Sequence, residues 1–216
     1  MTKTASSRRW LQEHFSDAYV QRAQAQGYRS RAVFKLQEIQ SRDRILAPGM
    51  TVVDLGAAPG GWSQFTTTQV KPGGKVIAVD VLPMEPVPGV IFLQGDLTEE
   101  QTWQSLISAL GDTPADVVLS DMAPNLSGNR SVDQPRAMYL AELALEAAEQ
   151  LLREGGCLLM KLFQGEGFEA FQRRLRQRFT KVAIRKPKAS RTRSREVYLL
   201  AQGFNPSGQF LKRGQV

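Results

Sequence analysis

The chain has 216 residues, of which 42% are hydrophobic and 23% charged, an ordinary composition for a globular protein with one α/β domain. No apolar run approaches the ~20 residues that cross a bilayer, and the basic N-terminus lacks the apolar segment of a secretory signal. The single cysteine, Cys157, cannot form an internal disulfide, so nothing indicates an oxidising compartment. We therefore expect a cytoplasmic protein with no membrane partner.

Charge is distributed unevenly along the chain. Residues 1–44 carry 9 Lys/Arg and 4 Asp/Glu, residues 45–172 carry 6 and 16, and residues 173–216 carry 13 and 1. The stretch 173–195 holds eleven Lys/Arg and no acid. A solvated face is one interpretation, but a polyanionic partner explains the concentration better, because clustered cations gain affinity by releasing counterions from phosphates. A membrane surface fits less well, since no strongly apolar helix face accompanies the charge.

Strand and helix signals alternate along most of the chain. After a basic arm over 1–15, we expect two N-terminal helices within 16–44, one capped by Ser16 and one over 31–42 capped by Ser30. The sequence then predicts strands over 51–55, 75–80, 90–93, 116–120, 157–163, 181–185 and 196–201. It predicts helices over 61–70, 99–110, 134–152 and 167–179. A single domain would extend over 16–203, followed by a flexible tail over 204–216.

This alternation predicts an α/β fold with a seven-stranded, mostly parallel sheet and helices on both faces. The last two strands are joined through 186–195, which is too short for a crossover helix. We therefore expect them to be antiparallel neighbours that form an edge hairpin. Such a hairpin separates a Rossmann-like methyltransferase sheet from an ordinary dinucleotide-binding one.

A glycine-rich turn follows the first predicted strand, in the segment 54–62, DLGAAPGGW. Its G-x-x-x-G-G spacing differs from the G-x-G-x-x-G that binds a pyrophosphate. Acids end three successive strands, at Asp54, Asp80 and Asp96. Asp80 could accept both ribose hydroxyls of an adenosine and Asp96 its amino group, although capping is the simpler interpretation of any one acid. Three carboxylates would repel a phosphorylated nucleotide but suit the cationic sulfonium of S-adenosylmethionine.

The later strands carry candidate catalytic residues. The fourth runs into 120–125, SDMAPN, which lacks the aromatic residue that base-amine methyltransferases use to hold a flipped base. The fifth carries Lys161 inside an apolar run. A lysine there needs either a partner or a path for its amine to solvent at the strand end. Glu196 opens the last strand, and Lys35 flanks the apolar arc of the second helix.

With these motifs the chain resembles the FtsJ/RrmJ family of ribosomal RNA ribose methyltransferases, from about Ser7 to Gly203. The resemblance rests on long and rare strings: DLGAAPGGWSQ, LQGD, SDMAPN, RAMYLAELALE, KLFQGEGF and SREVYLLA. It implies S-adenosylmethionine-dependent 2′-O-methylation of a uridine in large-subunit (23S) ribosomal RNA, acting on the assembled 50S subunit without a metal. The implied partner is ribosomal RNA in the large subunit, and we expect a monomer.

The resemblance also implies site residues. The family's catalytic Lys-Asp-Lys-Glu tetrad falls on Lys35, Asp121, Lys161 and Glu196. Its cofactor contacts fall on Gly60, Trp62, Asp80, Asp96 and Asp121. Desolvation and a neighbouring Lys35 would lower the pKa of Lys161 and allow it to act as a general base. Alternatively, a protonated Lys161 steers the lone pair of the ribose oxygen, and the sequence leaves both roles open.

Two other classes of function compete with this one. A nicotinamide oxidoreductase is opposed by the glycine spacing and the acidic cofactor rim. A non-catalytic RNA-binding or assembly protein should have lost part of the tetrad, whereas all four positions are filled. The one histidine, His14, lies in the basic arm, so a Ser-His-Asp triad or a histidine metal site has little support.

Overall fold

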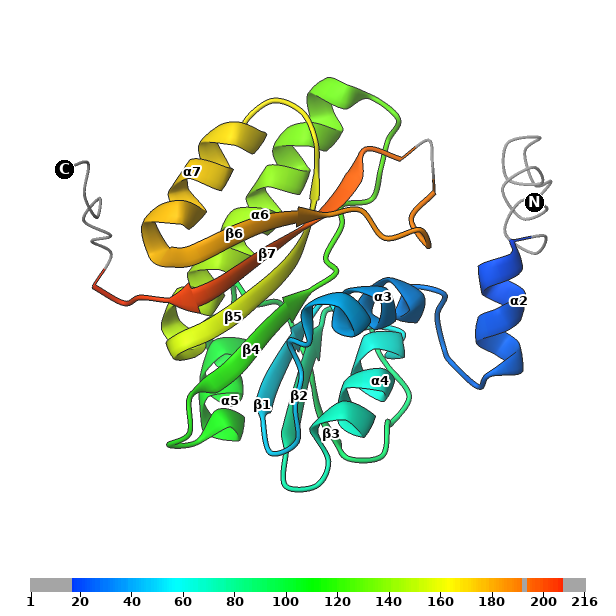
Figure 1. The fold of residues 1–216 in the computed structure, drawn as a ribbon, viewed down its shortest axis with the longest axis vertical. Helices are drawn as coiled ribbons and strands as arrows, with labels where there is room; N and C mark the ends of the chain where they lie inside the picture. The colour runs from blue at the N-terminus through cyan, green and yellow to red at the C-terminus, as the bar shows by residue number, and fades with distance from the viewer. Residues whose placement is uncertain (1–16, 192–193, 208–216) are drawn as a thin grey trace.

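The computed structural model describes residues 17–191 and 194–207, so the predicted basic arm over 1–15 lies outside the described residues. Within that part of the chain, seven strands form one sheet in the order β3-β2-β1-β4-β5-β7-β6 (Figure 1). They are β1 (Thr51–Leu55), β2 (Lys75–Asp80), β3 (Val90–Gln94), β4 (Ala115–Ser120), β5 (Leu152–Phe163), β6 (Phe179–Arg185) and β7 (Glu196–Phe204). Pairing is parallel from β3 to β5 and antiparallel on both sides of β7. The predicted α/β fold is confirmed.

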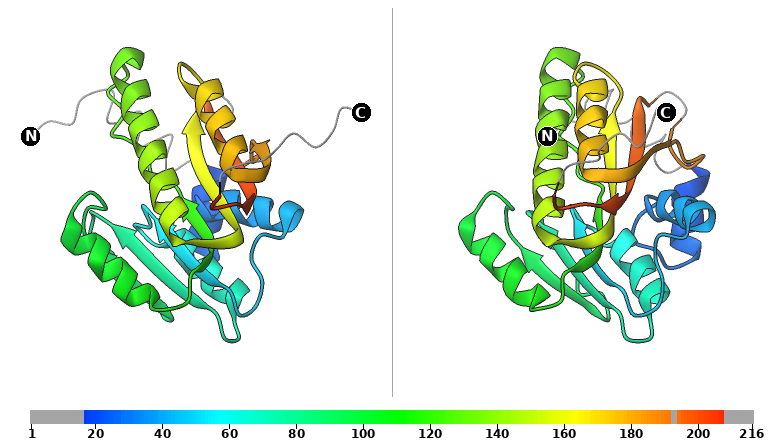
Figure 2. Two further views of the ribbon diagram at one scale, coloured as in Figure 1. Left: turned by 90° about the vertical axis from the view of Figure 1, so that its left-hand side faces the viewer. Right: turned by 60° about the vertical axis from the view of Figure 1, so that its left-hand side comes forward.

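Helices cover both faces of the sheet. They are α2 (Ala18–Ala25), α3 (Val33–Asp43), α4 (Gly61–Val70), α5 (Glu100–Leu110), α6 (Arg130–Leu151) and α7 (Phe168–Arg178). One core lies between the sheet and α5, α6 and α7, and the other between the sheet and α3 and α4. Figure 2 shows α5 and α6 (green) on one side of the sheet and α3 (blue) on the other. Within residues 17–191 and 194–207, no helix has the length and apolarity to cross a membrane.

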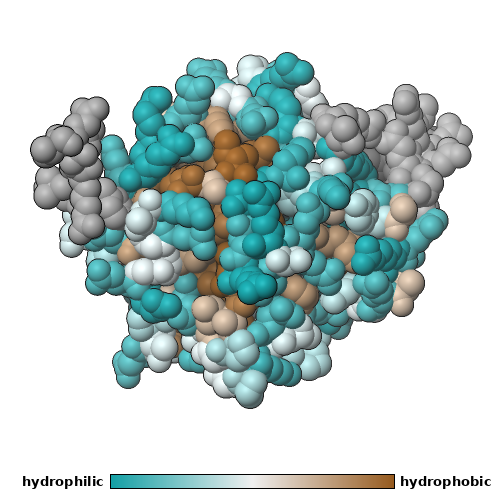
Figure 3. All heavy atoms as spheres, viewed as in Figure 1, coloured by the Kyte–Doolittle hydropathy of each residue, from teal (hydrophilic) through white to brown (hydrophobic). Residues whose placement is uncertain are grey.

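The two sheet faces differ in how fully helices cover them. On the face seen in Figure 1, α3 and α4 lie in front of the half of the sheet that contains β1 and β2, whereas β5, β7 and β6 face the viewer. Figure 3 shows hydrophobic side chains (brown) over the middle of this face, bordered by hydrophilic ones (teal). The exposed Ile184 of β6 belongs to this half.

Helix boundaries differ from the prediction by a few residues. α6 begins at Arg130, four residues before its predicted start, because the side chain of Asn129 accepts a hydrogen bond from the Ser131 N–H and caps the helix. Pro135 lies inside the early turns of α6, which is why the sequence suggested a later start. The two N-terminal helices conversely begin one and two residues later than predicted.

The last strand of the chain, β7, lies between β5 and β6 (Figure 1), and its antiparallel pairing with β6 confirms the predicted hairpin. The register with β5 places Tyr198 opposite Lys161 and Glu196 opposite Phe163. β7 extends to Phe204, so the predicted start of the tail at 204 is wrong by at least one residue. The cause is packing, because the ring of Phe204 lies 5.4 Å from that of Phe179 on β6.

Candidate active site

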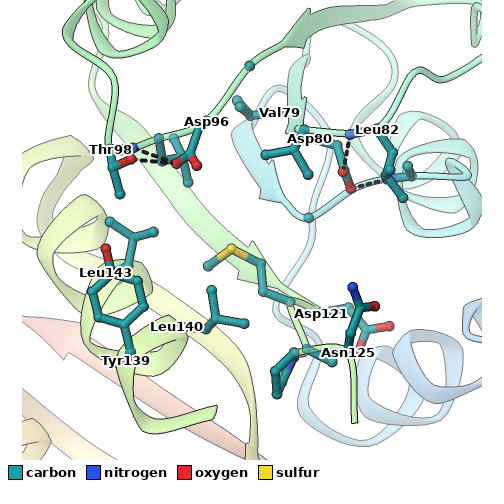
Figure 4. A pocket seen from close by; sticks show the side chains of 18 residues that line it. Val79, Asp80, Leu82, Asp96, Thr98, Asp121, Asn125, Tyr139, Leu140 and Leu143 are labelled. Carbon is teal, nitrogen blue, oxygen red and sulfur yellow. Dashed lines mark hydrogen bonds between the residues drawn. The ribbon is translucent and has the colours of Figure 1, made fainter. Parts of the chain in front are cut away.

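Three carboxylates gather at the carboxyl edge of the parallel strands. Asp80 ends β2, and Asp96 and Asp121 follow closely after β3 and β4. Parallel strands end at one edge of a sheet, so the segments that follow them border a common crevice. All three side chains line a pocket of about 580 Å³, whose opposite wall is formed by α6 side chains, among them Tyr139 and Leu143 (Figure 4).

The chemistry of this pocket suits a cationic adenosyl ligand. Among the described residues, no lysine, arginine or histidine lines it. The two oxygens of Asp80 accept from the N–H groups of Leu82 and Ala58, each at 2.8 Å, which fixes the carboxylate while leaving lone pairs for ribose hydroxyls. Asp96 Oδ1 accepts from the N–H and hydroxyl of Thr98 at 2.9 and 2.8 Å. Its Oδ2 can accept from another donor, so these residues fit S-adenosylmethionine.

Asp54, predicted as the third acid of this rim, does not line the pocket. It is the fourth residue of β1 rather than its end, and its side chain is completely buried against α4, where Oδ2 accepts from the Ser63 hydroxyl at 2.6 Å. Burial raises the pKa of Asp54 to about 7, the Ser63 bond offsets this in part, and the charges of Asp121 and Asp80 add to it. Asp121 therefore supplies the third carboxylate of the pocket.

Gly60 and Trp62, two of the predicted cofactor contacts, are also outside the lining of this pocket. Trp62 is buried, and its indole N–H donates to the carbonyl of Ala32 at 2.8 Å. Gly60 has φ +105°, a conformation that favours glycine, and a Cβ there would lie 2.8 Å from the sulfur of Met84. Both residues hold walls of the site together, and their direct contact with the cofactor stays a prediction.

Arg29 ties the segment before α3 to the cofactor half of the molecule, and sequence reasoning did not identify it. Its Nη1 donates to the carbonyl of Pro59 at 3.3 Å and to that of Glu85 at 2.5 Å, and Nη2 donates to the carbonyl of Pro86 at 2.6 Å. One guanidinium thus joins the glycine-rich turn to the loop that follows Asp80. Backbone carbonyls are its acceptors, and they leave no signature in a sequence.

The predicted tetrad comes together as two ion pairs supplied by four separate segments. Lys161 Nζ lies 3.0 Å from Asp121 Oδ1 and donates to the Asp121 carbonyl at 2.5 Å. Lys35 Nζ lies 2.7 Å from Glu196 Oε1, which also accepts from the Ser190 hydroxyl at 2.9 Å. All four charged side chains are at most 19% exposed. Their Coulomb interactions are consequently much stronger than those of surface pairs.

Tyr198 lies between the two ion pairs and was missed in the sequence. Its hydroxyl donates to Asp121 Oδ1 at 2.7 Å, and Lys35 Nζ lies 5.6 Å from the centre of its ring. It follows Glu196 by two residues on β7, a spacing that could have placed both side chains on one face. Burial and the charges of Asp121 and Glu196 raise the pKa of Tyr198 well above its usual value, so it remains a donor.

Asp121 is held in its charged form although it is buried. Burial by itself would raise the pKa of this carboxyl, but the ammonium groups of Lys161 and Lys35 and the hydroxyl of Tyr198 together lower it below its usual value. The centre therefore contains a fixed anion next to the cofactor pocket.

The basic cluster over 173–195 is divided between α7, β6, where Arg185 pairs with Asp43, and the connection that follows β6. On α7, Arg174 pairs with Glu142 and Arg178 pairs with Glu149, both on α6. The segment 186–195 instead connects β6 to β7 and leads directly to Glu196. The cations nearest the tetrad along the chain therefore lie in this connection. Two of the α7 arginines instead neutralise glutamates of α6.

Comparison with known proteins identifies the family of this chain. Residues 28–204 match the model of the FtsJ-like methyltransferase family. Two proteins named ribosomal RNA large subunit methyltransferase E, from two strains of Pseudomonas aeruginosa, are 58% identical over 204 residues, 94% of this chain and 99% of each relative. A crystal structure described as a ribosomal RNA methyltransferase from Plasmodium falciparum is 30% identical with a TM-score of 0.75, and the match covers 82% of this chain and 98% of that one. The chain therefore belongs to the FtsJ-like methyltransferase family, enzymes that transfer the methyl group of S-adenosylmethionine.

Proposed function

We propose that this enzyme methylates the 2′-hydroxyl of a uridine ribose in 23S ribosomal RNA, within the assembled 50S subunit. The observation that carries the proposal is the position of Asp121, which lines the cofactor pocket and also binds Lys161. A hydroxyl held by Lys161 is therefore next to the methyl donor. The names of the Pseudomonas relatives support ribosomal RNA as the substrate. The absence of an aromatic residue from SDMAPN favours a ribose over a base amine.

Three carboxylates have separate roles in cofactor binding. Asp80 accepts from the ribose hydroxyls, Asp96 from the adenine amino group, and Asp121 faces the methionine end, while Gly60 and Trp62 support the surrounding walls. Bound S-adenosylmethionine supplies an electrophilic methyl group on a sulfonium. Because the pocket has carboxylates and lacks cations among the described residues, it stabilises that positive charge before the reaction.

The tetrad orients the attacking oxygen. Lys161 uses two N–H donors on Asp121, which leaves the third for the ribose 2′-oxygen and turns a lone pair toward the methyl group. The carboxylate and the carbonyl of Asp121 both hold the Lys161 amine, and this fixed position supports the orienting role over that of a general base. Glu196, fixed by Lys35 and Ser190, accepts the proton that the hydroxyl loses.

Purified large subunits that lack the modification, incubated with the enzyme and radiolabelled S-adenosylmethionine, test this function. We expect label in 23S RNA as an alkali-resistant dinucleotide, because a 2′-O-methyl group blocks alkaline cleavage at its own nucleotide. Label released as a methylated base would contradict the proposal. The same assay with protein-free 23S RNA tests the preference for the assembled subunit, for which we expect the higher rate.

The proposal also includes the cellular location and the oligomeric state of the enzyme. A large-subunit substrate requires the enzyme to be where ribosomes assemble, so we propose a cytoplasmic enzyme. One copy of the chain supplies all four tetrad residues, so we propose that it acts as a monomer, built as a single domain from residue 16 to at least Phe204. Sedimentation at micromolar concentration checks the monomer.

A further inference from the structure

A second cavity adjoins the catalytic centre and is separate from the cofactor pocket. It has a volume of about 280 Å³, and its lining includes Leu126, Arg130, Asp133, Gln134, Phe163 and Arg195. The chain passes directly from the first pocket to this one, because Asp121 and Asn125 line the cofactor pocket and Leu126 lines the second cavity. A ligand in this cavity would thus lie across the segment 121–126 from the cofactor.

Two neighbouring residues at the start of α6 fix opposite walls of the cavity. Asp133 Oδ1 accepts from the N–H and hydroxyl of Ser127, each at 2.8 Å, and Oδ2 accepts from the Gly128 N–H at 3.0 Å. Gln134 Nε2 donates to the carbonyls of Phe163 and Glu166 at 3.3 and 3.0 Å. Both side chains are buried, so the two walls are held from within the protein.

The third wall is tied to the catalytic strand. Arg195 Nη1 donates to the carbonyl of Gln164, and the Gln164 N–H donates to the carbonyl of Arg195, both at 3.1 Å. Arg195 precedes Glu196, and Glu196 lies opposite Phe163 in the β5–β7 ladder. Phe163 follows Lys161 by two residues of β5, an advance of roughly 6.6 Å along a strand. At this backbone separation, one nucleoside is long enough to contact both side chains.

The exposed groups of the cavity match an unpaired base. Leu126 is 61% exposed although the loop that follows it is fixed by Asp133. Phe163 contributes an aromatic ring, and Arg130 and Arg195 contribute exposed guanidinium groups. Unpaired RNA bases are recognised by stacking on aromatic and apolar side chains and on guanidinium planes, with hydrogen bonds to their edges.

We propose that this cavity is the subsite for the base of the target nucleotide, whose ribose lies at Lys161, and that it selects uracil over cytosine and adenine. The assignment rests on the function proposed above. The carboxylate of Asp133 is occupied by three donors, so the guanidinium N–H groups of Arg130 and Arg195 are the charged groups left to face a base. Uracil offers them two carbonyl acceptors, whereas cytosine and adenine would direct an amino donor toward these donors.

The test uses large subunits whose 23S RNA carries either the natural uridine or a cytidine at the methylated position, which nuclease mapping of the labelled RNA locates. We expect wild-type enzyme to lose about tenfold or more in kcat/KM on the cytidine subunits. Leu126→Ser and Phe163→Leu should lower kcat/KM on uridine subunits by about 5- to 100-fold, the usual range for loss of a base-stacking contact. Calorimetry should show unchanged S-adenosylmethionine affinity in both variants, and Leu126 is exposed enough for its replacement to leave folding intact.

A matched pair of arginines on α6 tests the base selection. Arg130→Gln should reduce the uridine-to-cytidine ratio, whereas Arg136→Gln, an equal charge change at an exposed position outside the cavity, should leave the ratio unchanged. A wild-type ratio near one, or full activity of Leu126→Ser on uridine subunits, would overturn the assignment while leaving ribose methylation intact. If wild-type enzyme methylates neither kind of subunit, the proposed function itself fails, and this subsite fails with it.

Discussion

The carboxyl edge of the sheet has two halves of opposite character. The half formed after β2 and β3 presents the carboxylates of Asp80 and Asp96, and the described lining of its pocket contains no cation. The half formed by α3, β5 and β7 presents Lys35 and Lys161 and continues into the basic connection 186–195. Asp121 belongs to both. The acidic half thus attracts the cationic cofactor, and the basic half attracts the anionic RNA. Asp121 lies at the boundary between the two halves.

The largest effect is expected from the lysine of the basic half. Lys161→Met keeps the apolar stem and removes the nitrogen, so methyl transfer should fall by about 10²–10⁴, the usual worth of a positioned acid–base or orienting group. Cofactor affinity, which belongs to the other half, should stay near wild type in calorimetry. Near wild-type methylation of subunits by Lys161→Met would mean that Lys161 has neither role.

Replacing a carboxylate of the acidic half should weaken cofactor binding rather than the chemical step. Asp80→Ala removes a charged acceptor from the cofactor pocket, which should weaken S-adenosylmethionine binding by roughly 1.5–3 kcal/mol. Binding of RNA should not change. Asp112→Ala, an exposed acid in the turn after α5, is the control for loss of one negative charge. Calorimetry in which both variants bind the cofactor equally well would remove Asp80 from this role.

The buried carboxyl of Asp54 on β1 makes the stability of the protein sensitive to pH. Because burial raises the pKa of Asp54 to about 7, the folded protein retains a proton that the unfolded chain releases near pH 4. The contribution of this group to stability is therefore complete below about pH 4 and decreases as pH rises to about 7. We expect the urea midpoint of Asp54→Asn to decline less between pH 5 and pH 8 than that of the wild type. Parallel declines would show that Asp54 is already ionised at pH 5.

The smallest expected effect is on the salt dependence of RNA binding, when cations are removed from different parts of the basic cluster over 173–195. Replacing Lys188 and Arg191 by Gln removes cations of the β6–β7 connection and should lower the salt slope of RNA binding by about 2. The same change at Arg174 and Arg178, which pair with glutamates of α6, should leave the slope nearly unchanged. Equal slopes for the two double variants would show that α7 contacts RNA as much as the connection does.

Much of this architecture is predictable because local patterns determine it. Buried strands such as β1 and β2 are short apolar runs bounded by turn residues, and their predicted ranges are confirmed. Lys161 and Asp121 were both expected in the tetrad, and the structure joins them in an ion pair. A charged residue inside an apolar strand is a strong local signal, because its burial without a partner would be costly.

Other features depend on tertiary packing and leave a weaker signal. Asp54 lies one residue from the strand end, and the sequence alone does not say whether that side chain faces the crevice or the α4 helix. Tyr198 reads as an ordinary core residue until the β5–β7 register places it opposite Lys161. The carbonyl acceptors of Arg29 come from backbone that folds beside it only in the complete protein.

Because β7 lies between β5 and β6 and follows both in the chain, the order of synthesis limits when activity can arise. A nascent chain that ends before residue 196 contains Lys35, Asp121 and Lys161, but it lacks the Glu196 carboxylate and the Tyr198 hydroxyl that complete the centre. β6 also has no strand partner until β7 inserts beside it. The enzyme therefore becomes competent only after β7 has been synthesised, and a fragment truncated before β7 has no complete catalytic centre.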